Sequence, residues 1–205
     1  MTNILLIACT ILVQRLLFQT MNFELYQIPF ASSLMIFQSQ TGNLLQILYA
    51  FIPIPFILFE FSGRGRELTE GYGKLWVIRA YKRERLCLNT IKKCGLELLI
   101  IVLYQTVVFS LADEKWHDIS ISQTVLTLLT YYLGLFMIVL LQLYLEFVVE
   151  TSYANIFSNI FFLVSLFVGN RVLISDRLSW IGIILFPNML FGTRNGILYQ
   201  ETVYV

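Results

Sequence analysis

Apolar residues along this chain come in runs that are long enough to cross a membrane as helices. A spanning helix needs roughly 17–25 mainly apolar residues, because the hydrocarbon core is about 30 Å thick and each helical residue advances about 1.5 Å. Six runs stand apart, at 4–20, 44–61, 94–112, 121–149, 155–168 and 180–191. The pattern predicts an all-α, polytopic membrane protein with about six transmembrane helices, built as a single transmembrane domain over residues 1–205.

The last run is the shortest and leaves two arrangements open. Trp180–Phe191 covers twelve residues and is interrupted by Pro187 and Asn188. We expect it to continue through Gly192–Tyr199 as a sixth crossing, which puts both termini on the same side of the membrane. The alternative is five crossings followed by a segment that re-enters the membrane without spanning it.

Two earlier runs contain residues that disturb a membrane helix. Pro53 and Pro55 lie in the second run, and because each proline lacks a backbone N–H, we expect that helix to be kinked. Arg15 interrupts the first run. An arginine near a helix end commonly extends its guanidinium toward the headgroups, so we expect Arg15 to point outward, with pairing to Glu24 as the alternative.

Between the second and third runs lies a basic segment, residues 63–93. It holds nine of the 14 basic residues of the chain and three acidic ones, a net charge of +6. Loops rich in lysine and arginine stay on the cytoplasmic side of a membrane. This segment is therefore predicted to be cytoplasmic, and the alternation of six crossings then puts the N-terminus in the cytoplasm as well.

The two halves of the basic segment differ in their content of helix breakers. Four glycines, at 63, 65, 71 and 73, predict an irregular first half. Residues 74–93 contain no glycine or proline, and their apolar and basic positions suit a short amphipathic helix along the inner membrane surface. Four acidic residues of the neighbouring runs should lie near the same surface and pair with the basic segment: Glu60, Glu97, Glu146 and Glu150.

The fourth run carries one polar or small stripe on an otherwise apolar helix. Gln123, Thr127, Thr130 and Gly134 follow one another at helical spacing. Small and hydroxyl residues allow membrane helices to approach closely and to form hydrogen bonds with one another. The stripe predicts either a packing seam within the chain or a surface that meets another subunit or lines a substrate path.

Composition and motifs favour a transport or binding role over an enzymatic one. Charged residues make up 13% of the chain, about half of what a soluble domain carries. Its one histidine, His117, and its three cysteines have no metal-site spacing, and no phosphate-binding GxxxxGK[ST] motif occurs. We expect no catalytic residues, no metal, no cofactor bound to this chain and no nucleic-acid partner.

The basic segment resembles the cytoplasmic loop of permease subunits in bacterial ABC exporters of the second type. In these, a coupling helix between helices two and three docks on the ATPase, after an acidic-glycine pair and before a basic cluster. Here Glu70-Gly71 is followed by Lys74-Leu75-Trp76-Val77-Ile78 and then by Arg79-Ala80-Tyr81-Lys82-Arg83. The chain is most similar to small permeases of peptide-antibiotic or bacteriocin export and immunity systems.

The resemblance implies a multi-pass protein of the bacterial cell membrane that moves an amphiphilic substrate, peptide or lipid-like. It also implies an ABC ATPase subunit that holds ATP and Mg, a second permease chain, the same or related, and contact with membrane lipid. The residues that it assigns to coupling are Glu70, Gly71, Lys74, Leu75, Trp76, Ile78, Arg79, Lys82 and Arg83.

Two alternatives stay open beside this interpretation. The basic segment can be a plain inside loop that sets topology and binds anionic lipid. The chain can also be a non-transporting membrane assembly or immunity factor that acts by binding.

Overall fold

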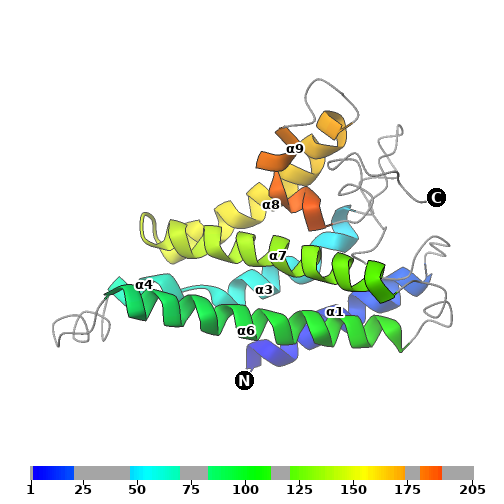
Figure 1. Cartoon of the computed structure of the whole chain (residues 1–205), viewed down its shortest axis with the longest axis horizontal. Helices are drawn as coiled ribbons and strands as arrows, with labels where there is room; N and C mark the ends of the chain where they lie inside the picture. Colours follow the sequence, from blue (N-terminus) through cyan, green and yellow to red (C-terminus); the bar gives the residue numbers. More distant parts are fainter. Residues whose placement is uncertain (1, 21–46, 70–82, 112–120, 174–180, 191–205) are drawn as a thin grey trace.

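The computed structural model describes residues 2–20, 47–69, 83–111, 121–173 and 181–190 (Figure 1). Within these residues the regular secondary structure is entirely helical, as predicted. The helices are α1 (Thr2–Thr20), α3 (Pro53–Phe61), α4 (Arg64–Thr69), α6 (Arg83–Ser110), α7 (Ile121–Glu146), α8 (Thr151–Leu173), α9 (Ile181–Ile184) and the 3-10 helix η2 (Phe186–Leu190).

Three helical stretches among the described residues are long and apolar enough to cross a membrane. They are Ile47–Leu68, Val125–Glu146 and Thr151–Gly169, and α1 adds a shorter apolar stretch at Ile4–Leu17. These stretches identify a membrane protein. The finer count of six crossings stays a prediction.

The prolines of the second run lie where a helix tolerates them. Residues 47–51 are helical, Ile52 is a turn, and α3 begins at Pro53. The first turn of a helix needs no intrahelical N–H, so Pro53 and Pro55 remove no hydrogen bond there. Ile52 keeps right-handed helical angles, and its N–H donates to Leu48 O at 3.2 Å. The helix expected to be kinked by the prolines is therefore interrupted at one residue, Ile52, and continues as α3.

Two expectations for the basic segment 63–93 were wrong in part. In its first half Gly63 does lie in a turn, but Gly65 does not break the helix, because α4 begins at Arg64 and includes it; Gly71 and Gly73 lie outside the described residues. Its last eleven residues, 83–93, are not part of a separate surface helix, because α6 runs without a break from Arg83 through the whole third run. Lys92 and Lys93 lie inside α6, because straight-chain basic residues are good helix formers.

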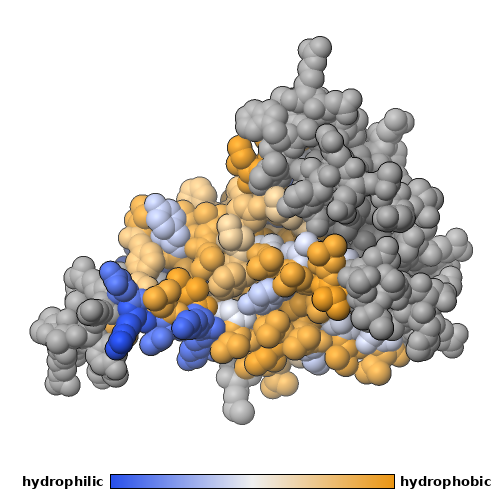
Figure 2. Space-filling view, viewed as in Figure 1, coloured by the Kyte–Doolittle hydropathy of each residue, from blue (hydrophilic) through white to orange (hydrophobic). Residues whose placement is uncertain are grey.

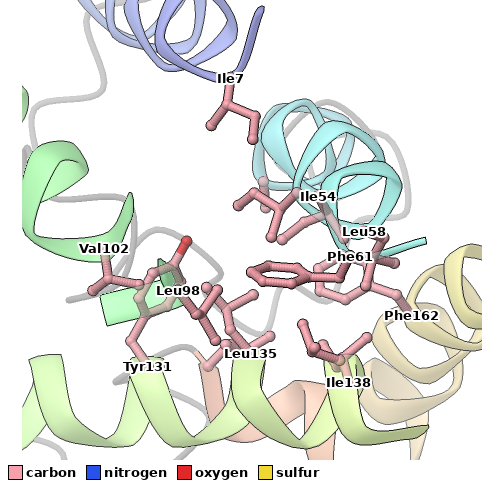
Figure 3. Close-up of a cluster of buried hydrophobic side chains, with 14 of the residues drawn as sticks. Ile7, Ile54, Leu58, Phe61, Leu98, Val102, Tyr131, Leu135, Ile138 and Phe162 are labelled. Atoms are coloured by element: carbon pink, nitrogen blue, oxygen red, sulfur yellow. The ribbon is translucent and has the colours of Figure 1, made fainter. Parts of the chain in front are cut away.

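The helices run largely antiparallel and share one apolar core (Figures 1 and 3). Figure 3 shows its middle, where α1, α3, α6, α7 and α8 each contribute side chains. Phe61, Leu98 and Phe162 are buried completely. Since α7 contributes to this core and also contacts α4, α6, α8 and η2, its two faces position most of the other elements.

A row of buried polar side chains crosses this core between α1, α6 and α7. Gln14 donates its Nε2 to the backbone O of Tyr49 at 3.1 Å, and Gln105 donates its Nε2 to Gln14 Oε1 at 3.1 Å. The Tyr131 hydroxyl donates to Gln105 Oε1 at 2.9 Å. These three side chains are at most 4% exposed. A polar row of this kind fixes the register of helices whose apolar faces would otherwise slide.

Arg15 points inward, contrary to the expectation that it extends toward the headgroups. Its side chain is buried, and the guanidinium carbon lies 5.6 Å from the centre of the Phe109 ring. The negative face of an aromatic ring attracts a cation, and this attraction grows where water is excluded. Glu24, the alternative partner, lies outside the described residues.

The broken sixth run packs against α7 and α8, and Asn188 joins it to α8. Asn188 is fully buried, and its Nδ2 donates to Ser165 O at 3.0 Å and to Leu185 O at 2.8 Å. Gly169 of α8 admits this side chain, because a Cβ there would overlap it. Within 181–190 the helices are far shorter than a span, while residues 191–205, through which a sixth crossing would continue, lie outside the described part.

Gly169→Ala should destabilise the protein by about 1–3 kcal/mol, because the added methyl group displaces Asn188 and breaks its two hydrogen bonds. Thermal unfolding of the purified protein in detergent measures the loss. Val168→Ala on the same helix is the control, since Val168 is exposed and its truncation should change stability by less than about 0.5 kcal/mol. Equal melting of both variants would contradict this packing.

Candidate functional site

Charged side chains gather at one end of the bundle, where α4 and the start of α6 lie (Figure 2). Four charged side chains and one glutamine, from α3, α4, α6 and α7, form what we name the polar node: Glu60, Arg64, Glu97, Gln142 and Glu146. Each of them makes a hydrogen bond or ion pair to another helix or to the turn between α3 and α4. The node links four helices, α3, α4, α6 and α7, through polar contacts.

Glu146 binds the turn between α3 and α4 through the backbone. Its Oε1 accepts the N–H of Gly63 at 2.7 Å and its Oε2 accepts the N–H of Gly65 at 2.8 Å. The first N–H groups of a helix have no intrahelical partner, and a carboxylate is the acceptor that best suits them. Glu146, from α7, therefore caps the beginning of α4 from a distant part of the sequence.

Gly63 in this turn and Gly65 in the first turn of α4 each meet a steric demand of the cap. Gly63 has a φ of +88°, in the left-handed region that residues with a side chain rarely adopt. A Cβ at Gly65 would lie 2.8 Å from Leu143 O and 2.9 Å from Glu146 Oε2, which is too close. The turn can approach the Glu146 carboxylate only because neither position carries a side chain.

Gln142, one turn before Glu146, supplies a hydrogen-bond donor to the last turn of α3. Ser62 donates its N–H to Phe59 O at 3.2 Å, which leaves Leu58 O without the backbone donor that an α-helix would supply. Gln142 donates its Nε2 to that Leu58 oxygen at 3.0 Å. One face of α7 thus satisfies the last turn of α3 and the first turn of α4.

Arg64 joins the same turn to α6. Its guanidinium forms ion pairs with Glu60 at 3.5 Å and with Glu97, and lies 4.9 Å from the centre of the Phe61 ring. Its Nη1 is also 3.8 Å from the Cys94 sulfur. An arginine that is four-fifths buried and shared by two carboxylates holds its neighbours in a defined geometry, because the planar guanidinium presents its donors in fixed directions.

The expected pairing of the acidic residues with the basic segment is confirmed in part. Glu60 and Glu97 pair with Arg64, whereas Glu146 binds backbone N–H groups of the segment and Glu150 is exposed in the turn after α7. Eight of the nine residues assigned to coupling lie outside the described residues, namely Glu70, Gly71, Lys74, Leu75, Trp76, Ile78, Arg79 and Lys82. Arg83 is the first residue of α6.

The four residues of the predicted stripe all lie on α7, in different surroundings. Gly134 is buried against η2, where a Cβ would come 2.9 Å from Leu190 Cδ2. Thr127 and Thr130 are half-buried, and the Thr130 hydroxyl donates to Thr127 O at 2.9 Å, within its own helix. The side chain of Gln123 lies outside what the structure describes. Gly134 therefore takes part in packing within the chain.

Sequence reasoning missed the glutamines that hold the helices together. Gln14 stands beside Arg15, whereas Gln105 and Gln142 are single amides within mainly apolar stretches of the third and fourth runs. An isolated amide in a membrane helix costs free energy unless it finds a partner, and that isolation was the available signal. Within the described residues, no group of three or more His, Cys, Asp or Glu side chains could hold a metal ion.

Glu146→Gln should destabilise the protein by about 1.5–3 kcal/mol, because an amide offers one acceptor oxygen where the carboxylate offers two and leaves one turn N–H unsatisfied. Chemical or thermal unfolding in detergent measures the change. Glu150→Gln removes the same charge four residues away at an exposed position and should shift stability by less than about 0.5 kcal/mol. If the two variants unfold alike, the carboxylate is not the cap of α4.

Comparisons with known proteins give the family of the chain. No solved structure matches it. The uncharacterized protein YybK of Bacillus subtilis (strain 168) is 26% identical over 179 residues, which cover 84% of this chain and 71% of that protein. A family model described as "Protein of unknown function (DUF2705)" matches residues 5–205. The chain therefore belongs to the DUF2705 family.

Proposed function

We propose that this chain is the permease subunit of a bacterial ABC exporter of the second type, a multi-pass protein of the cell membrane with a cytoplasmic N-terminus. It forms part of a path for an amphiphilic substrate, driven by a separate ATPase that carries ATP and Mg, and works with a second permease chain. The proposal starts from the resemblance at residues 70–83. The observation that carries it is the polar node at the base of that segment.

The node supports the proposal because it makes the base of the segment rigid. Segment 70–82 leaves from the end of α4 and returns at Arg83, the start of α6. Glu146 bonds the start of α4 to α7, and Arg64 ties it to α6 through Glu97. A displacement of the segment by a partner would therefore be passed to three helices, as a shift of packed rigid elements.

The chemistry of the segment suits a docking helix. Leu75, Trp76 and Ile78 offer apolar side chains for a groove on an ATPase, and buried aromatic anchors contribute most of the affinity of such contacts. Arg79 and Lys82 add positive charge that orients the encounter. ATP binding stays on the partner, in keeping with the absence of a phosphate-binding motif in this sequence.

The cytoplasmic side follows from the distribution of charge. The described basic residues of segment 63–93, which lie in α4 and the first turns of α6, and the polar node occupy the end of the bundle that carries α4, and α1 runs away from that end (Figure 1). If the positive-inside rule places this end in the cytoplasm, the N-terminus faces the cytoplasm too.

A pull-down of the tagged protein from membranes of its own organism tests the proposal. The wild type should bring down an ABC ATPase, and Trp76→Ala combined with Ile78→Ala should reduce its amount at least about ten-fold, since two anchors at roughly 1–2 kcal/mol each are lost. Phe147→Ala combined with Val148→Ala is the matched control, because both side chains are exposed in the turn after α7. It should retain the ATPase.

Membrane insertion of every variant is checked by fractionation. If the wild type brings down no ATPase, the proposal fails, and an assembly or immunity factor that acts by binding becomes the better account. If the double variant retains the ATPase fully, the coupling role of these two residues is wrong.

A further inference from the structure

The outward face of α6 changes from basic to apolar along its length. Arg85, Lys92 and Lys93 are exposed in its first three turns. The exposed side chains that follow carry no polar group, apart from the hydroxyl of Tyr104: Leu96, Leu99, Ile100, Leu103, Val107 and Leu111. Positions 85, 92, 96, 103 and 107 recur at intervals of seven and four residues, which keeps them on one side of a helix. One stripe of exposed side chains on α6 is therefore basic at its start and apolar over the rest of its length.

The length of this stripe matches the hydrocarbon thickness of a bilayer. From Lys92 to Leu111 the helix advances by nineteen residues, about 28 Å, close to the roughly 30 Å thickness of a hydrocarbon core. If α6 crosses the membrane, as the apolar run at 94–112 predicts, Lys92 and Lys93 stand at the level of the headgroups and Leu111 reaches the far boundary. Leu88, one turn earlier, is 54% exposed, so apolar surface continues among the basic residues.

The charge at this end of α6 is available to an external anion. The carboxylate that follows the two lysines, Glu97, is already paired with Arg64. Glu84 is the one other acid that the structure describes between residues 83 and 97, and it lies beyond Arg85 toward the helix start. The outward-facing groups between Arg85 and Leu96 thus carry net positive charge.

We propose that Arg85, Lys92 and Lys93 bind the phosphate headgroup of an anionic phospholipid of the cytoplasmic leaflet, whose acyl chains lie along Leu96, Ile100 and Leu103. Basic residues at a membrane surface attract anionic lipid, and adjacent exposed apolar side chains add contact with its tails. The continuity of the stripe favours a lipid over a soluble protein, because a soluble partner could not follow it beyond Lys93 into the hydrocarbon. This site does not depend on the proposed transport function.

Native mass spectrometry of the full chain in detergent, titrated with phosphatidylglycerol or phosphatidylcholine, tests the site. Wild type should bind phosphatidylglycerol more tightly. Arg85→Gln, Lys92→Gln and Lys93→Gln together should weaken this binding about 100-fold, roughly five-fold for each charge removed, and leave phosphatidylcholine binding unchanged. The matched control exchanges the same residues with retention of charge, Arg85→Lys with Lys92→Arg and Lys93→Arg, and should keep the preference.

Three results would overturn the site. They are equal affinity of the wild type for the two lipids, an undiminished preference in the triple glutamine variant, and displacement of phosphatidylglycerol by an equal concentration of glycerol 3-phosphate, which would mean that the apolar stripe contributes nothing. The three substituted positions are exposed, so unfolding temperatures of both variants should stay near that of the wild type. The ATPase pull-down uses other residues, so failure of one proposal is distinct from failure of the other.

Discussion

The carboxylate of Glu146 is the constraint on which the end of the fold that carries α4 depends. It is buried, and a buried charge is costly unless hydrogen bonds replace the water that it has lost. Two backbone N–H groups, those of Gly63 and Gly65, supply those bonds. The charge therefore forces the α3–α4 turn against α7 and directs α4 toward the start of α6. Substituting either glycine would move the turn away from its acceptor.

The buried glutamine row gives the same kind of order farther along the bundle. Between membrane helices, apolar contacts discriminate poorly among registers, because lipid tails are as apolar as leucine. Gln14, Gln105 and Tyr131 hold α1, α6 and α7 at one depth, while the polar node holds α3, α4, α6 and α7 at another. With both layers formed, helices that belong to both, such as α6, can shift only together with their neighbours. That property suits a subunit that transmits movement.

The helices and their class could be predicted from the sequence because apolar runs of membrane length have few other structures available. The charged end could be predicted too, since nine basic residues cluster there. The inward orientation of the Arg15 side chain could not be predicted, because it depends on the Phe109 ring, which is remote in sequence. Neither could the helical state of Gly65. Glycine alone favours irregular backbone, and the compensating carboxylate comes from residue 146.

The partners of the polar residues were the least predictable part. Glu146 was expected to pair with the basic segment, yet it binds backbone N–H groups of that segment. Nearly every residue carries such a group, so the sequence does not indicate which ones a carboxylate will bind. The continuity of α6 was missed for a related reason. Charged residues at 83–93 suggested a surface helix, but lysine and arginine extend a helix as readily as the apolar residues that follow.

Hydrogen exchange at single-residue resolution on the Gly63 and Gly65 amides tests the central claim most directly. In the wild type both amides should exchange slowly, although they lie in a turn and at the start of a short helix, where amides ordinarily exchange fast. Glu146→Gln should accelerate the exchange of at least one of them by about ten-fold or more, the loss of roughly 1.4 kcal/mol of protection, while Glu150→Gln leaves both slow. Rapid exchange of both amides in the wild type would contradict the account, because the carboxylate would then not hold the turn.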